Sequence, residues 1–157
     1  MPNLLALIAL MLFQPSGAAP DFAIRFDHKG CHYEYIDTFK GTYSHTGATT
    51  PVPFVLSDDH RQQLFGAIIA AKFFDLPSRT PAAGSGDPAD NLELEVRNSG
   101  RHHTVAWSVG SEWLQAETGR PLRQLHRAIL DLLATHPDVK RLPARGDGCY
   151  GGPPKVR

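Results

Sequence analysis

The sequence predicts an α+β fold in which two helices pack on one face of an antiparallel sheet. Short segments with alternating apolar and polar residues, joined by turn-forming pairs, indicate strands early in the chain and again over 92–107. Two other segments have apolar residues at helical spacing, and each of them follows a group of strands. The order strands, helix, hairpin, helix is packed most simply as a two-layer sandwich.

The first strand is expected over 22–26, where large apolar residues alternate with Ala and Arg. Lys29-Gly30 can form a two-residue turn. That turn would place Phe26 opposite Tyr33, so that the apolar faces of the first two strands agree.

The second strand is expected to run to about residue 39. A turn at 40–41 then leads to a third strand over 42–45. Residues 46–53 are rich in Thr, Gly and Pro, and they are expected to form a loop or an edge strand.

The first helix is expected to begin after Ser57, a good N-cap residue, and to continue to about Phe74 before Pro77 ends it. An amphipathic pattern is formed by Leu64, Phe65, Ile68, Ile69 and Lys72. Residues 78–90 contain two prolines, two glycines and no large apolar side chain, which predicts a loop.

The clearest hairpin follows this loop, with Ser99-Gly100 as its turn. Burial of the apolar side chains selects one register, because a shift by one residue would place them opposite polar ones. The expected cross-strand pairs are Val96 with His103, Leu94 with Val105, and Leu92 with Trp107.

A second loop over 108–120 leads to Pro121, which suits a first helical turn. The apolar stripe of the second helix consists of Leu122, Leu125, Ile129, Leu132 and Leu133. His136-Pro137 should end this helix, and the Gly- and Pro-rich tail 144–157 is expected to be extended.

The loops 78–90 and 108–120 enter and leave one hairpin at the same end, so they should lie close together and form a binding edge. Trp113 lies in the second loop and could bind a partner or fold back over the core. Arg120 and Arg123 share one helix face and could contact an anionic partner, although a charged stripe is more often a solvated surface.

Residues 1–18 have the features of an export signal. An apolar run over 4–13 is too short to span a bilayer, and the small residues Ser16-Gly17-Ala18 suit a signal peptidase. The mature chain is therefore expected to begin at Ala19, to fold as one domain over 19–143, and to work in the periplasm or outside the cell. No later apolar stretch is long enough for a membrane span.

Two cysteines, Cys31 and Cys149, lie near opposite ends of the mature chain. In an oxidising compartment such a pair is expected to form a disulfide, which would tie the tail to the first hairpin. A catalytic thiol is the alternative, since His28 and His32 flank Cys31.

The eight histidines raise the question of a metal site. His28, His32 and Asp27 form the best candidate, because the expected pairing places Asp27 opposite His32 and imidazole and carboxylate bind zinc or copper. His102 and His103 are adjacent on a strand and point to opposite faces, so His103 is expected to be a hydrogen-bonded core residue.

The sequence supports neither a known catalytic motif nor a nucleic-acid-binding surface. Basic and acidic residues number 16 each, without the dense basic face that nucleic acids require. The sequence has no nucleophile elbow, no H-E-x-x-H motif and no phosphate-binding loop. The pattern G-x-G-x-x-G over 146–151 lacks the helix that a dinucleotide site needs after it.

Several segments together resemble a family of small exported bacterial proteins of unknown function. The segments that carry the resemblance are residues 22–26, 37–43, 73–77, 96–98 with His103 and Trp107, 136–140, and Gly148-Cys149. They span nearly all of the mature chain and are mostly strand faces, turns and a helix end. The resemblance implies export and an α+β fold, and it implies no activity and no functional residues.

The expected function is that of a non-catalytic binding module of the bacterial envelope, which recognises a protein or another envelope component. An inhibitor of a secreted enzyme is a related possibility. The alternatives from other classes are a periplasmic metal-binding protein or metalloenzyme that uses the histidine cluster, and a hydrolase whose site is assembled from distant residues.

Overall fold

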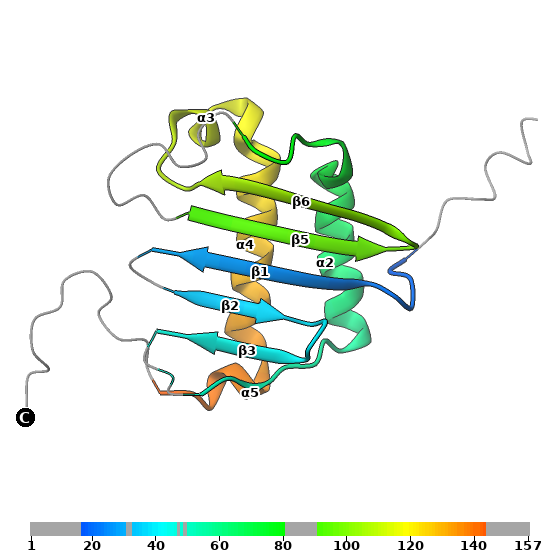
Figure 1. Cartoon of the computed structure of the whole chain (residues 1–157), viewed down its shortest axis with the longest axis vertical. Helices are drawn as coiled ribbons and strands as arrows, with labels where there is room; N and C mark the ends of the chain where they lie inside the picture. Colours follow the sequence, from blue (N-terminus) through cyan, green and yellow to red (C-terminus); the bar gives the residue numbers. More distant parts are fainter. Residues whose placement is uncertain (1–16, 31–32, 47, 49, 81–90, 144–157) are drawn as a thin grey trace, which may run out of the picture.

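The computed structural model describes residues 17–30, 33–46, 48, 50–80 and 91–143. Its centre is a six-stranded sheet in which every neighbouring pair is antiparallel, with the order β4-β3-β2-β1-β5-β6. The strands are β1 (Ala23–Lys29), β2 (Glu34–Asp37), β3 (Thr42–His45), β4 (Val52–Pro53), β5 (Asn91–Asn98) and β6 (Arg101–Ser108). The long helices α2 (Asp58–Ala70) and α4 (Arg120–Thr135) lie on the same face of the sheet (Figure 1). The predicted α+β fold is therefore confirmed.

The register between β1 and β2 differs from the prediction. Phe26 lies opposite Ile36 and not opposite Tyr33, because the connection after β1 is longer than two residues. A shift by an odd number of residues exchanges the two faces of a strand. Ile36 is consequently buried beneath the helices, whereas the rings of Tyr33 and Tyr35 stack on the opposite face.

The third strand and the edge strand follow the prediction. β3 covers 42–45, and the short strand β4 pairs with it at Val52 and Pro53. A proline lacks a backbone N–H group, so Pro53 limits further pairing at this edge.

The hairpin of β5 and β6 has the predicted register, in which Val96 lies opposite His103 and Leu94 lies opposite Val105. Its turn residues Ser99 and Gly100 both have positive φ angles, of 51° and 72°. Positive φ at both central residues is the geometry that continues the twist of the two strands, and glycine adopts it without strain.

Helix α2 begins as predicted, with the hydroxyl of Ser57 accepting the N–H of His60 at 3.2 Å. It ends at Ala70, earlier than expected, because Lys72 adopts a left-handed conformation before the short helix η1 (Phe73–Asp75). The amphipathic pattern was wrong at one position: Ile68 is fully buried, whereas Ile69 is 52% exposed.

Helix α4 buries the whole predicted stripe against the sheet and α2. It is preceded by α3 (Glu112–Gln115) and the 3₁₀ helix η2 (Glu117–Gly119), which occupy the predicted loop. His136 ends α4, and the ring accepts a hydrogen bond from the N–H of Asp138 at the start of α5 (Pro137–Lys140). Of the described residues, none belongs to a helix that is long and apolar enough to cross a membrane.

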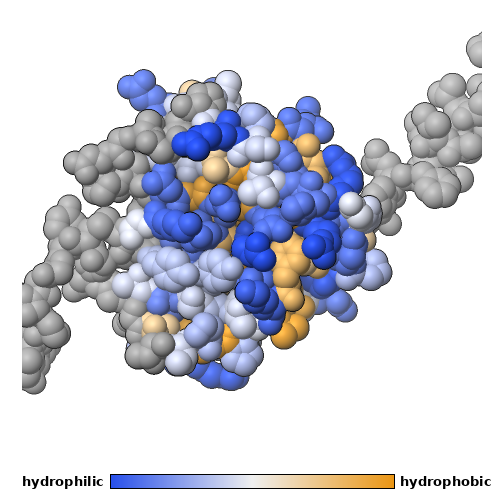
Figure 2. All heavy atoms as spheres, viewed as in Figure 1, coloured by the Kyte–Doolittle hydropathy of each residue, from blue (hydrophilic) through white to orange (hydrophobic). Residues whose placement is uncertain are grey.

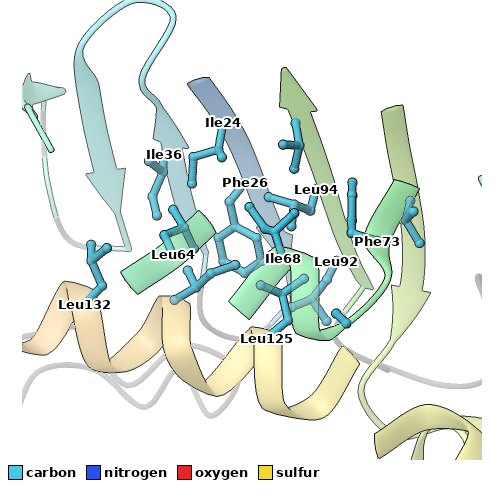
Figure 3. Packing of buried hydrophobic residues seen from close by; sticks show 14 of the residues in the cluster. Ile24, Phe26, Ile36, Leu64, Ile68, Phe73, Leu92, Leu94, Leu125 and Leu132 are labelled. Atoms are coloured by element: carbon cyan, nitrogen blue, oxygen red, sulfur yellow. The ribbon is translucent and has the colours of Figure 1, made fainter. Parts of the chain in front are cut away.

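The core lies between the sheet and the two long helices. Phe26 of β1 points from the centre of the sheet toward Leu64 and Ile68 of α2 and Leu125 of α4 (Figure 3). All these side chains are buried, so the helices cover one face of the sheet. A binding site on the sheet is therefore expected on its other face or at its edges.

The segment before β1 holds the β5–β6 turn through Asp21. Its carboxylate accepts the N–H groups of Gly100 at 2.9 Å and of Ser99 at 2.8 Å. These hydrogen bonds, that of Gly100 foremost, hold the pKa of Asp21 below its ordinary value.

We expect Asp21→Asn to lower the melting temperature at neutral pH. A group whose pKa is lowered by folding stabilises the protein above its unfolded-state pKa of about 4, and this contribution is lost as pH falls through the folded-state pKa. The difference between the native protein and the variant should therefore shrink in thermal melts below about pH 4. The role of Asp21 would be refuted if the difference in melting temperature stayed constant with pH, or if Asp131→Asn changed the melting temperature by the same amount.

Candidate binding surface

The face of the sheet opposite the helices, here called the open face, is polar and charged. Figure 2 views this face and shows mainly hydrophilic residues with a few apolar patches between them. Strand alternation places on it Arg25, Asp27 and Lys29 of β1, Tyr35 and Asp37 of β2, Glu93, Glu95 and Arg97 of β5, and His102, Thr104 and Ala106 of β6.

Arg25 neutralises the centre of the open face. Its Nη1 donates to Glu95 at 2.6 Å, and its Nε donates to Asp37 at 3.4 Å. Asp37 also accepts the hydroxyl of Tyr35 at 3.1 Å, and its side chain is fully buried. Burial, together with this hydrogen bond, raises the pKa of Tyr35. These groups satisfy one another and form a structural network.

At the end of the open face near the β5–β6 turn, the charged side chains are likewise held by contacts within the protein. The guanidinium groups of Arg25 and Arg97 lie 5.3 Å and 4.8 Å from the centre of the Phe39 ring, and His102 bonds Glu95 at 2.8 Å. Cation–π contacts of this kind hold the side chains against the sheet.

The opposite end of the open face has a hollow of about 180 Å³. Residues 78–80 pair with β6 at Ala106, so that Arg79, Ala106, Glu93 and Asp27 form one row across neighbouring strands. Ala106 has the smallest side chain in this row, so the floor of the hollow lies at Ala106, between the larger side chains of its neighbours. The other lining residues are Lys29, Asn91, Leu92 and Trp107.

Two carboxylates face each other in the hollow. Asp27 lies directly opposite Glu93, a placement that is unfavourable for two like charges. Lys29 bonds one oxygen of Asp27 at 2.9 Å, and this contact raises the pKa of Lys29. Within the residues that the structure describes, Asp27 Oδ1 accepts no hydrogen bond and Glu93 forms no ion pair.

The hollow lies at the end of the hairpin at which the sequence predicts that the two loops meet. Residue 79 of the first loop lines it, and residues 81–90 lie outside the described part of the chain. The second loop leaves β6 directly after Ser108, so the start of one loop and the origin of the other lie side by side.

The structure places the three predicted binding residues in α3 and in the first turn of α4. Trp113 is half-buried and packs against the core, which agrees with the second of its two expected roles, that of a core-covering side chain. Arg120 forms an ion pair with Glu117. Arg123 donates to the carbonyl oxygens of Leu114 and Ala116, and thereby ties α4 to the end of α3.

The metal candidate is divided between the two faces of the sheet. Asp27 lies on the open face, whereas His28 is buried on the helix side, with its ring 5.8 Å from that of His126. Adjacent strand residues cannot direct both side chains at one ion. His32 is outside the described residues, and those that are described include no group of three His, Cys, Asp or Glu suited to a metal ion.

A buried polar row on the helix side was missed by the sequence analysis. His28, Glu34 and His45 lie opposite one another on β1, β2 and β3, and all three are nearly inaccessible to solvent. Tyr43 lies within 3.4 Å of the Glu34 carboxylate. The wrong β1–β2 register had placed Glu34 on the other face, so no signal in the sequence pattern brought the three together.

Two further predictions on polar residues have different outcomes. His103 is confirmed as a hydrogen-bonded core residue, because its Nε2 bonds the carbonyl oxygen of Leu76 at 2.7 Å and its ring contacts Phe73. The predicted disulfide between Cys31 and Cys149 involves residues outside the described part and stays a prediction.

Comparison with known proteins adds no relative from which a site could be transferred. No protein-family model matches the chain, and no curated protein matches it.

Proposed function

We propose that the protein is an exported, non-catalytic binding module of the bacterial envelope, and that its hollow receives a basic side chain of a protein partner. The observation that carries this proposal is the pair of facing carboxylates, Asp27 and Glu93, of which Asp27 Oδ1 accepts no hydrogen bond from the described residues. A lysine or arginine side chain placed between them would relieve their repulsion and supply the missing donors.

The size of the hollow agrees with one side chain. Its volume of about 180 Å³ lies below the roughly 300–1,000 Å³ of typical small-molecule pockets. A guanidinium or ammonium group on its aliphatic stem fits such a space, whereas a nucleotide or a folded segment does not.

The local charges select for a cation on the carboxylate side of the hollow. Lys29 is 69% exposed and holds Asp27 by a single contact, so it can turn outward when a partner arrives. Arg25 is engaged by Glu95 and Asp37, which prevents it from neutralising Glu93. The hollow itself is lined by two carboxylates, Asp27 and Glu93, and by two cationic side chains, Lys29 and Arg79.

Export rests on the sequence of residues 1–18, and the absence of catalysis rests on the lack of known catalytic motifs in the sequence. A rigid sheet that presents charged side chains at fixed positions suits recognition without chemistry. The partner is accordingly sought among envelope proteins with an exposed basic segment.

The proposal is tested by NMR titration of the isotope-labelled mature chain with the capped peptide Gly-Arg-Gly. We expect amide shifts centred on Asp27, Glu93 and Ala106, and an affinity about tenfold lower for Glu93→Gln, because one charge-assisted hydrogen bond is lost. Asp131→Asn removes an exposed carboxylate on the helix side and should leave the titration unchanged. Equal binding of capped Gly-Glu-Gly, or shifts centred on the helices, would overturn the proposal.

A further inference from the structure

We infer that the amino group released by export cleavage at the predicted Ala18–Ala19 bond is held by the side chain of Asn98. This inference rests on the export part of the proposed function and is independent of the hollow. It gives a structural reason for the predicted processing site and a structural role to the new N-terminus.

Ala19 is the first residue whose two backbone groups are both bound by distant parts of the described fold. Its nitrogen donates to Asn98 Oδ1 at 2.9 Å, and Asn98 is only 5% exposed. Its carbonyl oxygen accepts Arg61 Nη2 at 2.6 Å and the N–H of Phe22 at 2.9 Å. A chain that starts here keeps every one of these hydrogen bonds.

Cleavage at either neighbouring bond would fit the structure less well. A cut after Ala19 would remove the donor to Asn98 and leave a buried amide oxygen without its partner. A cut before Ala18 would place the charge at an exposed contact with Gln62, 3.2 Å from the Ala18 nitrogen. The small residues at 16 and 18 also place a peptidase at the Ala18–Ala19 bond.

The chemistry of the step strengthens the contact with Asn98. A signal peptidase adds water across the Ala18–Ala19 amide. The water oxygen goes to the Ala18 carbonyl carbon, which becomes a carboxylate, and both water protons go to the Ala19 nitrogen, which becomes an ammonium group. The donor to Asn98 Oδ1 is then charged, and charge-assisted hydrogen bonds are stronger than neutral ones. Arg61 donates to the carbonyl oxygen of the same residue and does not compete for the Asn98 oxygen.

The docked terminus also supports the β5–β6 turn. Asn98 ends β5, and Asp21, two residues after Ala19, holds the turn amides of Ser99 and Gly100. Ala19 and Asp21 thus both bind the end of the β5–β6 hairpin, which would hold a new N-terminus at Ala19 in place.

The site of cleavage is tested by the intact mass of the full-length chain after expression in an exporting bacterium and recovery from the envelope fraction. We expect a mass that begins at Ala19. A mature chain that begins at any other residue overturns the inference and leaves the binding proposal intact. A full-length chain found in the cytoplasm would overturn both this inference and the proposed export.

The docking of the amino group is tested by its rate of acylation in a chain that begins at Ala19. We expect it to react about fivefold more slowly than in Asn98→Ala, since the hydrogen bond must first be broken. Asn98→Asp keeps the acceptor and should retain or extend the protection, which covers the case in which the alanine variant does not fold. Equal rates in the native protein and in both variants, with the exposed Lys72 amine as internal reference, would overturn the docking.

Discussion

Ile68→Ala is expected to lower the free energy of unfolding by about 2–5 kcal/mol. Ile68 is fully buried and lies on the face of α2 that contacts the sheet and α4 (Figure 3). Truncation removes apolar contacts and leaves a cavity that the surrounding strands cannot fill, because Phe26 and Leu94 are fixed by the sheet. Denaturant unfolding followed by circular dichroism measures the change.

Ile69→Ala is the matched control, with the same side chain one residue further along the same helix. Ile69 is 52% exposed, so its truncation should change the free energy of unfolding by no more than about 0.5 kcal/mol. Equal losses for the two variants would show that α2 is rotated relative to its position in this fold.

Gly119→Ala is expected to cost about 1–3 kcal/mol. A Cβ atom at this position would lie within 2.6 Å of the carbonyl carbon of Leu114 and would also overlap its carbonyl oxygen and Cα. The obstacle is backbone, which Arg123 and the packing of Leu114 hold in place. The junction of α3, η2 and α4 would therefore have to shift, and thermal melts should show a lower melting temperature.

Gly66→Ala provides the comparison for that variant. Gly66 lies within α2, and no atom would lie within 4 Å of an added Cβ. Alanine in an exposed helix interior is favoured over glycine by up to about 1 kcal/mol, so this variant should gain stability. A loss in both variants would indicate that the glycine-to-alanine change itself, and not the close approach at Gly119, is responsible.

Local sequence patterns were sufficient for the elements whose partners are close along the chain. The β5–β6 register followed from the alternation of apolar residues and from Ser99-Gly100, which form the turn alone. The buried stripe of α4 followed from helical spacing. The β1–β2 register failed because Lys29-Gly30 is only the first part of a longer connection, and a turn-forming pair cannot reveal that.

The candidate site could not be predicted for a related reason. Asp27 and Glu93 are distant in the sequence and become neighbours because β5 inserts beside β1. Similarly, Arg79 reaches the hollow because residues 78–80 pair with the edge of β6. Strand order is set by the packing of the whole sheet, and it leaves no mark in the pattern of a single strand. The sequence analysis pointed to the end of the hairpin at which the hollow lies, where loop 78–90 begins.

Site-specific photocrosslinking in the cells that make the protein tests the central claim most directly. A photoreactive residue replaces the exposed Asn91 at the hollow or, as the control, Ala128 on the helix side. We predict that position 91 gives one crosslinked envelope protein, that the crosslink maps beside a lysine or arginine, and that Glu93→Lys abolishes it. No product from position 91, a product that survives Glu93→Lys, or the same product from position 128 would contradict recognition of a basic side chain at the open face.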